Sequence, residues 1–399
     1  MGRALFLRTT VVAGIAVVMA KVLFSCVDLA SLGNGPPDAQ APPITDSAVP
    51  DVVDPCSHVE PAGASEANDS TDELPTFVLA LDTVIIDSKK VSPLDLDGYC
   101  TCDTRPGTPG DGGPSCASTA VACDGDGGAD NALGAVADTY ASVVSIERIV
   151  NRLIASGHRT LLLQIQKYNG LANDAEVVVG TIVADGIHSQ GCPSSVFDPV
   201  KQVWSAGRCG NDAWTLSRES VVASGNPVPF VVGTGYVRDH QLVVRLNNAA
   251  LLPFNDESTV RFRVPILTGH LVALAEDLAP RDPARAPTEK EKRLFRIDDG
   301  LLAGRVLAQE ALATLGSYLQ SSGARLCTSP GFGFVHTGIC GAADIPGQGK
   351  APFDLSKSCD ALSAALGFVA IPALAAYVSD AAVPLTGCEA VDAAAFMCP

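Results

Sequence analysis

The chain has 399 residues, 47% of them hydrophobic, which is enough apolar material for one large core or two smaller ones. Its formal charge is −17, and its 27 basic residues are spread along the chain. Nucleic-acid binding needs clustered Lys and Arg, so this composition argues against nucleic acid as a partner. Thirteen cysteines indicate an oxidising compartment and a disulfide framework.

The first 26 residues have the features of a secretory signal. Arg3 and Arg8 precede an apolar segment at residues 9–20 that is too short to span a bilayer. Residues 23–26, LFSC, resemble a bacterial lipobox, which implies lipid attachment at Cys26 after cleavage. Cleavage after Ala20, which would give a soluble exported protein, and an uncleaved anchor helix are the alternatives. Lipidation of Cys26 would leave twelve of the thirteen cysteines, an even number for pairing.

Residues 27–74 are rich in Pro, Ala, Asp, Ser and Gly and contain few large apolar side chains. Such a segment buries too little surface to offset its loss of conformational entropy. We expect a disordered tether between a membrane and a folded domain, with Cys56 as its one cysteine.

Residues 75–276 have the pattern of a mainly β domain. Short apolar runs separated by Gly, Pro, Asn and Asp predict strands, which we place at residues 76–87, 160–168, 176–187, 214–223, 228–237, 241–246, 259–266 and 270–275. An apolar stripe predicts one helix over residues 138–156, ending at Gly157. The expected fold is α+β: an antiparallel β-sandwich with accessory helices, stapled by disulfides.

The remaining residues begin with a Pro-rich and charged segment at 277–293, which we interpret as an exposed connector. The part from residue 294 to 399 should form a hairpin with Asp299 and Gly300 in its turn, then a helix over residues 309–320. Residues 360–367 have a helical composition, although residues 368–373 equally suit a closing strand. We expect this Cys-rich C-terminal part to pack on the same domain.

The most unusual stretch is the Cys- and Asp-rich loop at residues 95–131. Its four cysteines form no C-x2-C knuckle, and export disfavours free thiolates, so disulfides are preferred over a zinc site. Four cysteines allow three pairings. Elsewhere, Cys192 with Cys209 and Cys327 with Cys340 are the obvious local pairs. The candidates for disulfide bonds are Cys56, Cys100, Cys102, Cys116, Cys123, Cys192, Cys209, Cys327, Cys340, Cys359, Cys388 and Cys398.

The same loop carries carboxylates at a spacing that resembles the opening of a calcium loop. The candidate oxygen ligands are Asp95, Asp97, Asp124, Asp126, Asp130 and Asn131. A full EF-hand is excluded, because the last position of such a loop would be Ala135 in place of a bidentate Glu. Two interpretations stay open: a calcium site, or solvated Asp-Gly turns in an acidic protein.

Both tryptophans of the chain flank Cys209. Trp204 and Trp214, with Asn211 and Asp212, have the residue types of a sugar-binding face, in which an aromatic ring stacks beside hydrogen-bonding groups. The alternative is that both rings simply pack beneath a disulfide.

The LFSC motif, the Pro/Ala/Asp tether and the segments LDLDGYCTCD and CDGDGGADN resemble the Cys-rich, Asp-rich lipoproteins of Gram-negative cell envelopes. This resemblance implies a location at the outer membrane, and it implies no particular activity. We therefore expect an exported binding or structural module that recognises carbohydrate or another surface protein. The alternative is a secreted polysaccharide hydrolase with an Asp/Glu pair, since such pairs have no local signature.

Overall fold

The computed structural model describes residues 58–64, 68–101, 115–117, 123–141, 145–222, 228–229, 231–274, 295–320, 323–348, 356–379, 388 and 393–398. All of them belong to the second of two compact units, Asp54–Pro399. The predicted signal with Cys26, the connector at residues 277–293, Cys56 and Cys102 lie outside the described residues.

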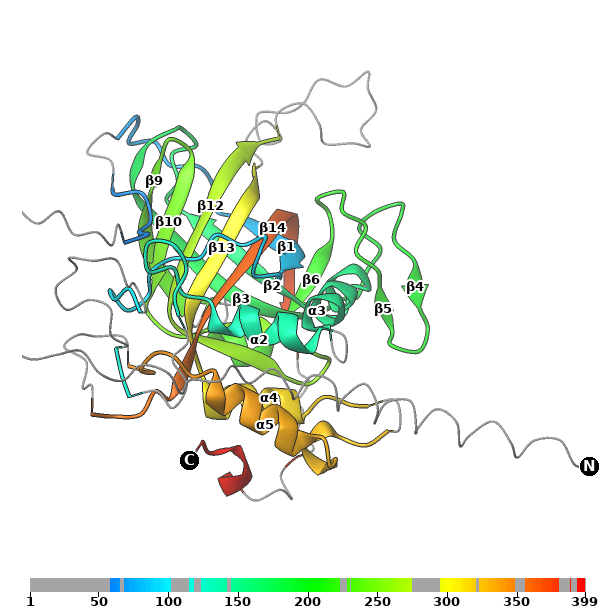
Figure 1. The fold of residues 1–399 in the computed structure, drawn as a ribbon. Coiled ribbons are helices and arrows are strands. Elements are labelled where there is room, and N and C mark those ends of the chain that lie inside the picture. Colours follow the sequence, from blue (N-terminus) through cyan, green and yellow to red (C-terminus); the bar gives the residue numbers. More distant parts are fainter. Residues whose placement is uncertain are drawn as a thin grey trace, which may run out of the picture. The chain divides into compact units, whose positions relative to one another are not determined.

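The main sheet is a closed barrel of eight strands (Figure 1). Each strand pairs antiparallel with the next, and the last strand pairs with the first. The strands are β1 (Phe77–Ile85), β2 (Thr160–Gln166), β3 (Asp174–Ile187), β9 (Val231–Arg238), β10 (Gln241–Leu246), β12 (Thr259–Ala273), β13 (Phe295–Leu307) and β14 (Ala361–Val378).

The predicted β-sandwich is therefore wrong, although the mainly β composition and the accessory helices are confirmed. Short alternating strands are common to sandwiches and barrels. What distinguishes the two here is the pairing of β1 with β14, in which Val78 lies opposite Ala373 and Ile85 opposite Gly367. The two strands are far apart in the sequence, so no local sequence pattern predicts their pairing.

One large apolar cluster fills the barrel and continues beneath the helices. Successive strand residues alternate between faces, so every second side chain points inward. The inward set includes Leu79, Leu81, Leu161, Leu163, Val177, Val179, Leu242, Val244, Leu302, Leu366 and Phe368. Gly300 permits one close contact in this core, because a Cβ there would lie 2.4 Å from the Phe368 ring.

The segment between β3 and β9 forms small additions to the barrel. They are the hairpin of β4 (Phe197–Asp198) and β5 (Val203–Trp204), strand β6 (Ala213–Leu216), the 3-10 turn η1 (Arg218–Ser220), and the pair β7 (Val221–Val222) and β8 (Val228–Pro229). Strand β6 pairs with both β3 and β14. The short strand β11 (Ala250–Pro253) pairs with the beginning of β12.

The helices gather at the end of the barrel where β1 finishes and β2 begins, drawn at the bottom of Figure 1. They are α2 (Ala132–Tyr140), α3 (Ile146–Ala155), α4 (Ala308–Gly316) and α5 (Phe332–Gly341), with the 3-10 turns η3 (Leu326–Thr328) and η4 (Ala393–Phe396). Helix α3 contacts β1, α2 contacts β14, and α4 contacts β12 and β13. We call this the helix end of the barrel.

The helix predicted over residues 138–156 is divided in two. Helix α3 begins after Ser145, whose side chain accepts a hydrogen bond from the Arg148 N–H, as an N-cap does. The predicted stop at Gly157 is confirmed, since its φ is +70°. The predicted start at residue 138 is wrong, because α3 begins only after its cap at Ser145 and residue 138 belongs to α2.

Two other predictions fail in the C-terminal part. Residues 295–307 form one strand and no hairpin, and Asp299, with φ +50°, marks an irregularity in the pairing of β13 with β14. Residues 360–367 are not a helix, because β14 runs from Ala361 through this Ala-rich segment. Its small side chains suit a strand that is buried by neighbours on both faces.

Four disulfides have both partners described: Cys116–Cys359, Cys192–Cys209, Cys327–Cys388 and Cys340–Cys398. The Cys192–Cys209 prediction is confirmed, and the local pair of Cys327 with Cys340 is wrong. Cys100 and Cys123 are also disulfide-bonded. Because Cys116 bonds to Cys359, the cysteines of the Asp-rich loop do not pair only with one another, and a zinc site of all four thiolates is ruled out.

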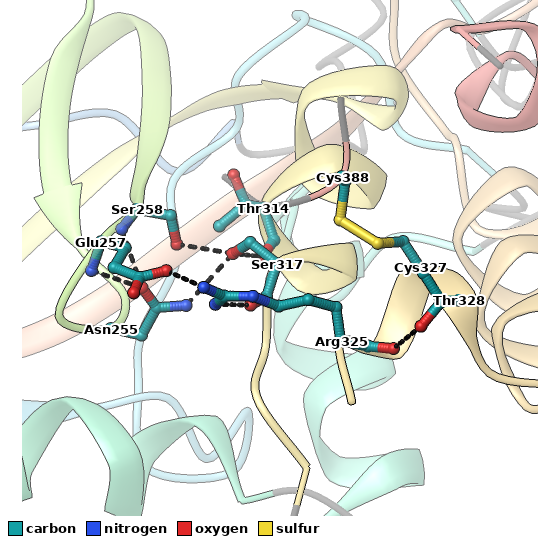
Figure 2. The surroundings of a disulfide bond; sticks show 9 residues. All are labelled: Asn255, Glu257, Ser258, Thr314, Ser317, Arg325, Cys327, Thr328 and Cys388. Atoms are coloured by element: carbon teal, nitrogen blue, oxygen red, sulfur yellow. Dashed lines mark hydrogen bonds and ion pairs between the residues drawn. A yellow bond between two sulfur atoms is a disulfide. The ribbon is translucent and has the colours of Figure 1, made fainter. Parts of the chain in front are cut away.

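Figure 2 shows how the C-terminal part is fastened to the turn between β11 and β12. Ser317 at the end of α4 accepts from the Asn255 side chain (3.1 Å) and donates to Ser258 Oγ (3.0 Å). Arg325 donates to the Ser317 carbonyl (2.6 Å) and forms an ion pair with Glu257. The Cys327–Cys388 disulfide follows directly, so covalent and polar contacts hold the same corner.

The end of the predicted tether is part of the folded domain. The Val59 N–H donates to the Gly127 carbonyl (3.0 Å), and the Leu74 N–H donates to the Tyr168 carbonyl (2.7 Å). The Tyr236 hydroxyl donates to the Ala62 carbonyl. Ordered structure thus extends back to residue 58.

Candidate metal centre in the Asp-rich loop

The Asp-rich loop lies against the outer face of β12, β13 and β14. Val91 and Leu94, just before the loop, join a small apolar cluster with Ile266, Leu301, Ala303 and Ala365, and Leu96 of the loop packs against it. Backbone hydrogen bonds draw the two ends of the loop together. Val59 bridges them, because its carbonyl accepts from the Asp95 N–H (2.9 Å) and its N–H donates to the Gly127 carbonyl (3.0 Å). The Asp130 N–H also donates to the Leu94 carbonyl (3.0 Å). Residues far apart in the loop therefore meet at one place.

The carboxylates of Asp95, Asp97 and Asp130 converge at this place. Each offers an oxygen, and the three oxygens lie within 4.8 Å of one another. All three groups are withdrawn from solvent, since the Asp95 side chain is 2% exposed, Asp97 8% and Asp130 1%. Three carboxylates so close and so buried repel one another strongly unless a cation or protons offset their charge.

Turn geometry positions two of these side chains. Asp95 Oδ1 accepts hydrogen bonds from the Asp97 N–H (3.2 Å) and the Gly98 N–H (2.7 Å), and Asp97 Oδ1 accepts from the Tyr99 N–H (2.9 Å). These are the local bonds of Asp in Asx turns. His58 Nδ1 meets Asp95 Oδ2, a contact that sequence patterns did not indicate.

Asp130 has one satisfied oxygen and one unsatisfied oxygen. Its Oδ2 accepts from the Leu96 N–H at 2.6 Å. Its Oδ1 is buried and accepts no hydrogen bond from any residue that the structure describes. Buried carboxylate oxygens normally have a partner, so this atom needs a cation or a proton.

Arg305 of β13 is a buried guanidinium beside this cluster. It donates to the Pro346 carbonyl at 2.6 Å and to the Leu96 carbonyl. Its positive charge acts on Asp97 and Asp130 as well as on Asp344 and Asp360. One guanidinium thus faces four carboxyl groups.

Burial and mutual repulsion shift the ionisation of these groups. Burial, followed by the charges of Asp97 and Asp124, raises the pKa of Asp130 to about 10. Burial also raises the pKa of Asp124 to about 6 and that of Asp97 above its usual range. A bound divalent cation acts in the opposite direction, because it favours the ionised carboxylate.

The other predicted ligands have different positions. Asp124 Oδ2 accepts from the Thr101 N–H (2.6 Å) at the border of the cluster, whereas Asp126 is exposed. Asn131 Oδ1 accepts from the Gly134 N–H (3.0 Å) and the Ala365 N–H (3.0 Å), so it caps α2. Of the six candidate residues, the structure thus brings together Asp95, Asp97 and Asp130, while Asp126 and Asn131 have other positions.

The predicted sugar-binding residues do not form one exposed face. Trp214 is 2% exposed and belongs to an apolar cluster, so neither face of its ring is open to a sugar. The buried Asp212 carboxylate accepts from the Gly207 N–H (2.9 Å) and the Arg208 N–H (2.8 Å). Trp204 is half-buried and Asn211 is exposed.

Comparison with known proteins gave no family model, no curated protein and no solved structure that matches the chain. None of the helices in the described ranges combines the length and the apolar character needed to cross a membrane.

Proposed function

We propose that this protein is an exported binding or structural module of the cell envelope, and that its Asp-rich loop binds calcium. The observation that carries the calcium proposal is the convergence of Asp95, Asp97 and Asp130 within 4.8 Å around a buried, unsatisfied Asp130 oxygen. Calcium takes several hard oxygen ligands from flexible, Gly-turned loops, and carboxylates provide them singly or in pairs.

The ion has a structural role in this proposal. Its ligands come from both ends of the loop, and the loop covers an apolar part of β13 and β14. Calcium would neutralise the carboxylates and tie these ends together on the barrel wall. The loop is then fixed by the ion as well as by the Cys116–Cys359 disulfide and the disulfides of Cys100 and Cys123.

The test is calorimetric titration of calcium into the chelator-treated, disulfide-intact protein. We expect one binding event and a higher melting temperature. Asp130→Asn removes a charge from the centre and should weaken binding at least about tenfold, as loss of a metal-site charge usually does. Asp126→Asn is the matched control, because Asp126 is exposed, and should bind like the wild type.

An absence of heat and of any change in melting would remove calcium from the proposal. Equal weakening by Asp126→Asn would show that general acidity, and not the converged carboxylates, attracts the ion. Repeating the titration with magnesium distinguishes a calcium site from a magnesium site, because magnesium is a small octahedral ion that dehydrates reluctantly.

The proposed location in the cell envelope rests on the signal-like N-terminus and is tested separately. Mass spectrometry of the mature N-terminus should find a lipid-modified Cys26. An unmodified chain beginning at Lys21 would replace the anchor with soluble export.

The partner of the module is proposed to be a carbohydrate or a surface protein. A glycan array combined with a reducing-end assay distinguishes this proposal from the hydrolase alternative, because release of reducing ends would indicate an enzyme. The converged carboxylates are nearly buried, so they are poorly placed to act on a polysaccharide chain.

A further inference from the structure

Strands β11 and β12 form a two-stranded flap across the helix end of the barrel. In the flap, Leu252 pairs with Val260 and Leu251 with Arg261. Paired residues point to the same face, and neighbouring pairs point to opposite faces. The face with Leu252 and Val260 lines a small apolar cavity of about 40 Å³ beside α3 and α4. The opposite face carries Leu251 and Arg261, and Arg261 reaches toward Glu310 in the first turn of α4.

A larger pocket of about 610 Å³ lies on this second face. The flap bounds it on one side. Inward-facing residues of β2, β3, β9 and β10, near the helix end of the barrel, bound it on the other. Its volume falls within the range of roughly 300–1,000 Å³ that is usual for small-molecule sites. The flap and the helices thus cover one part of the barrel end and leave this pocket at the other.

The deep wall of the pocket is apolar. Leu161 of β2 pairs with Val183 of β3, and Val231 of β9 pairs with Thr181 of β3. Leu246 of β10 continues the same inward-facing surface. Leu251 faces them from the flap, so an aliphatic group would find hydrocarbon on both sides.

The mouth of the pocket is polar, and its arginine Arg261 has only a distant ion partner. Arg263 forms an ion pair with Glu310 at 2.7 Å, and the same carboxylate oxygen is 3.9 Å from Arg261. Glu219, also at the mouth, is already paired with Arg159 at 3.1 Å. Among the described residues, two arginines therefore share one carboxylate, in a chain whose net charge is −17.

A bulge in β12 shapes this mouth. Val264 has φ +46°, which is unusual for a β-branched residue, and the pairing with β13 shifts between Arg263 and Ile266. Gly304 makes room for the bulge, because a Cβ there would lie 2.9 Å from the Arg263 carbonyl. The bulge leaves Val264 51% exposed at the pocket. Such strain is typical of binding sites.

We propose that this pocket binds a small amphiphile with an anionic head group, of the class of medium-chain aliphatic carboxylates. The aliphatic chain lies between Leu251 and the inner wall of the barrel, and the carboxylate meets Arg261 at the mouth. The proposal is independent of the calcium site, which lies on the outer face of the barrel.

Calorimetry on the mature, disulfide-intact chain tests it, with decanoate and decyltrimethylammonium as probes below their micelle concentrations. The wild type should bind one decanoate per chain, about tenfold more tightly than the cationic probe, as expected for one charge-assisted contact. Arg261→Gln should remove this preference. Ala249→Trp, which fills the pocket, should abolish binding of both probes. Arg245→Gln is the control on the outer face of β10.

The proposal is overturned if the wild type shows no saturable decanoate binding, or if a folded Ala249→Trp variant binds like the wild type. If Arg261→Gln weakened the binding of decanoate and of decyltrimethylammonium equally, the proposed contact with the anionic head group would be contradicted. Should Ala249→Trp fail to fold, the exposed Arg261 substitution still decides, because it leaves the core unchanged.

Discussion

At the scale of single residues, Asp344 joins the C-terminal part to the barrel. Its Oδ1 accepts from the Ser363 N–H at 2.7 Å, and its Oδ2 accepts from the Ser363 hydroxyl at 2.5 Å. Although the residue as a whole is half-buried, its carboxylate faces inward. Burial raises the pKa of Asp344 to about 7, well above 3.8 for the free side chain.

This shift predicts a pH dependence. Between the two pKa values the native state holds a proton that the unfolded state has lost, so stability falls as pH rises from about 4 to 7. Asp344→Asn keeps the shape but does not ionise. It should flatten the decline in melting temperature between pH 5 and 8 by roughly 5 °C, or about 2 kcal/mol. Thermal melts in saturating calcium measure it, and parallel curves for the two proteins would contradict it.

Two glycines of the Asp-rich loop form a matched pair. Gly98 and Gly128 both have positive φ, +79° and +72°. A Cβ on Gly98 meets nothing within 4 Å, whereas a Cβ on Gly128 would lie 2.7 Å from the Tyr99 carbonyl and 3.0 Å from Asp95 Oδ2.

Gly98→Ala should therefore cost about 1 kcal/mol, the strain of positive φ alone. Gly128→Ala should cost at least twice as much and also weaken calcium binding about tenfold, because it displaces a ligand. Urea unfolding and calcium titration measure the two effects. Identical losses in both variants would show that the close approach at Gly128 has no influence on the site.

At the scale of elements, strands with clear alternation were predictable from sequence. The ranges of β1, β2 and β10 agree closely with the prediction, because each is short, apolar and bounded by turn residues. Strand β14 was ambiguous, since its Ala-rich first half has a helical composition and only burial between β1 and β13 makes it a strand.

The candidate site shows the same division. The local sequence placed Asp95, Asp97 and Asp130 among six candidates, together with Asp124, Asp126 and Asn131, because Asp-Gly turns are a local signal. His58 and Arg305 could not be found in this way, since they approach from the predicted tether and from β13. The disulfide from Cys116 to Cys359 was equally hidden, because cysteine spacing does not encode long-range pairing.

At the scale of the whole molecule, disulfides and the proposed calcium ion share the task of holding the loops. Three disulfides span 243, 61 and 58 residues. By chain entropy, the two shorter loops give about 4 kcal/mol each and the longest gives about 5.5 kcal/mol. One ion at a thousand times its dissociation constant also gives about 4 kcal/mol.

Reduction should therefore lower the melting temperature more than chelation does. Parallel thermal scans with a reductant, with a calcium chelator and with both measure this order. A larger loss from the chelator would reverse it and make the ion the principal fastening of the domain.

The pairing of β1 with β14 has a consequence for the order of assembly. Until residues 361–378 are available, the sheet has two open edges, and unpaired edges recruit other strands. Closure joins segments almost 300 residues apart, so we expect folding to be slow and its last step to depend on the end of the chain. Cys359 lies just before the start of this final strand. Formation of the Cys116–Cys359 bond is therefore a marker that the barrel has closed.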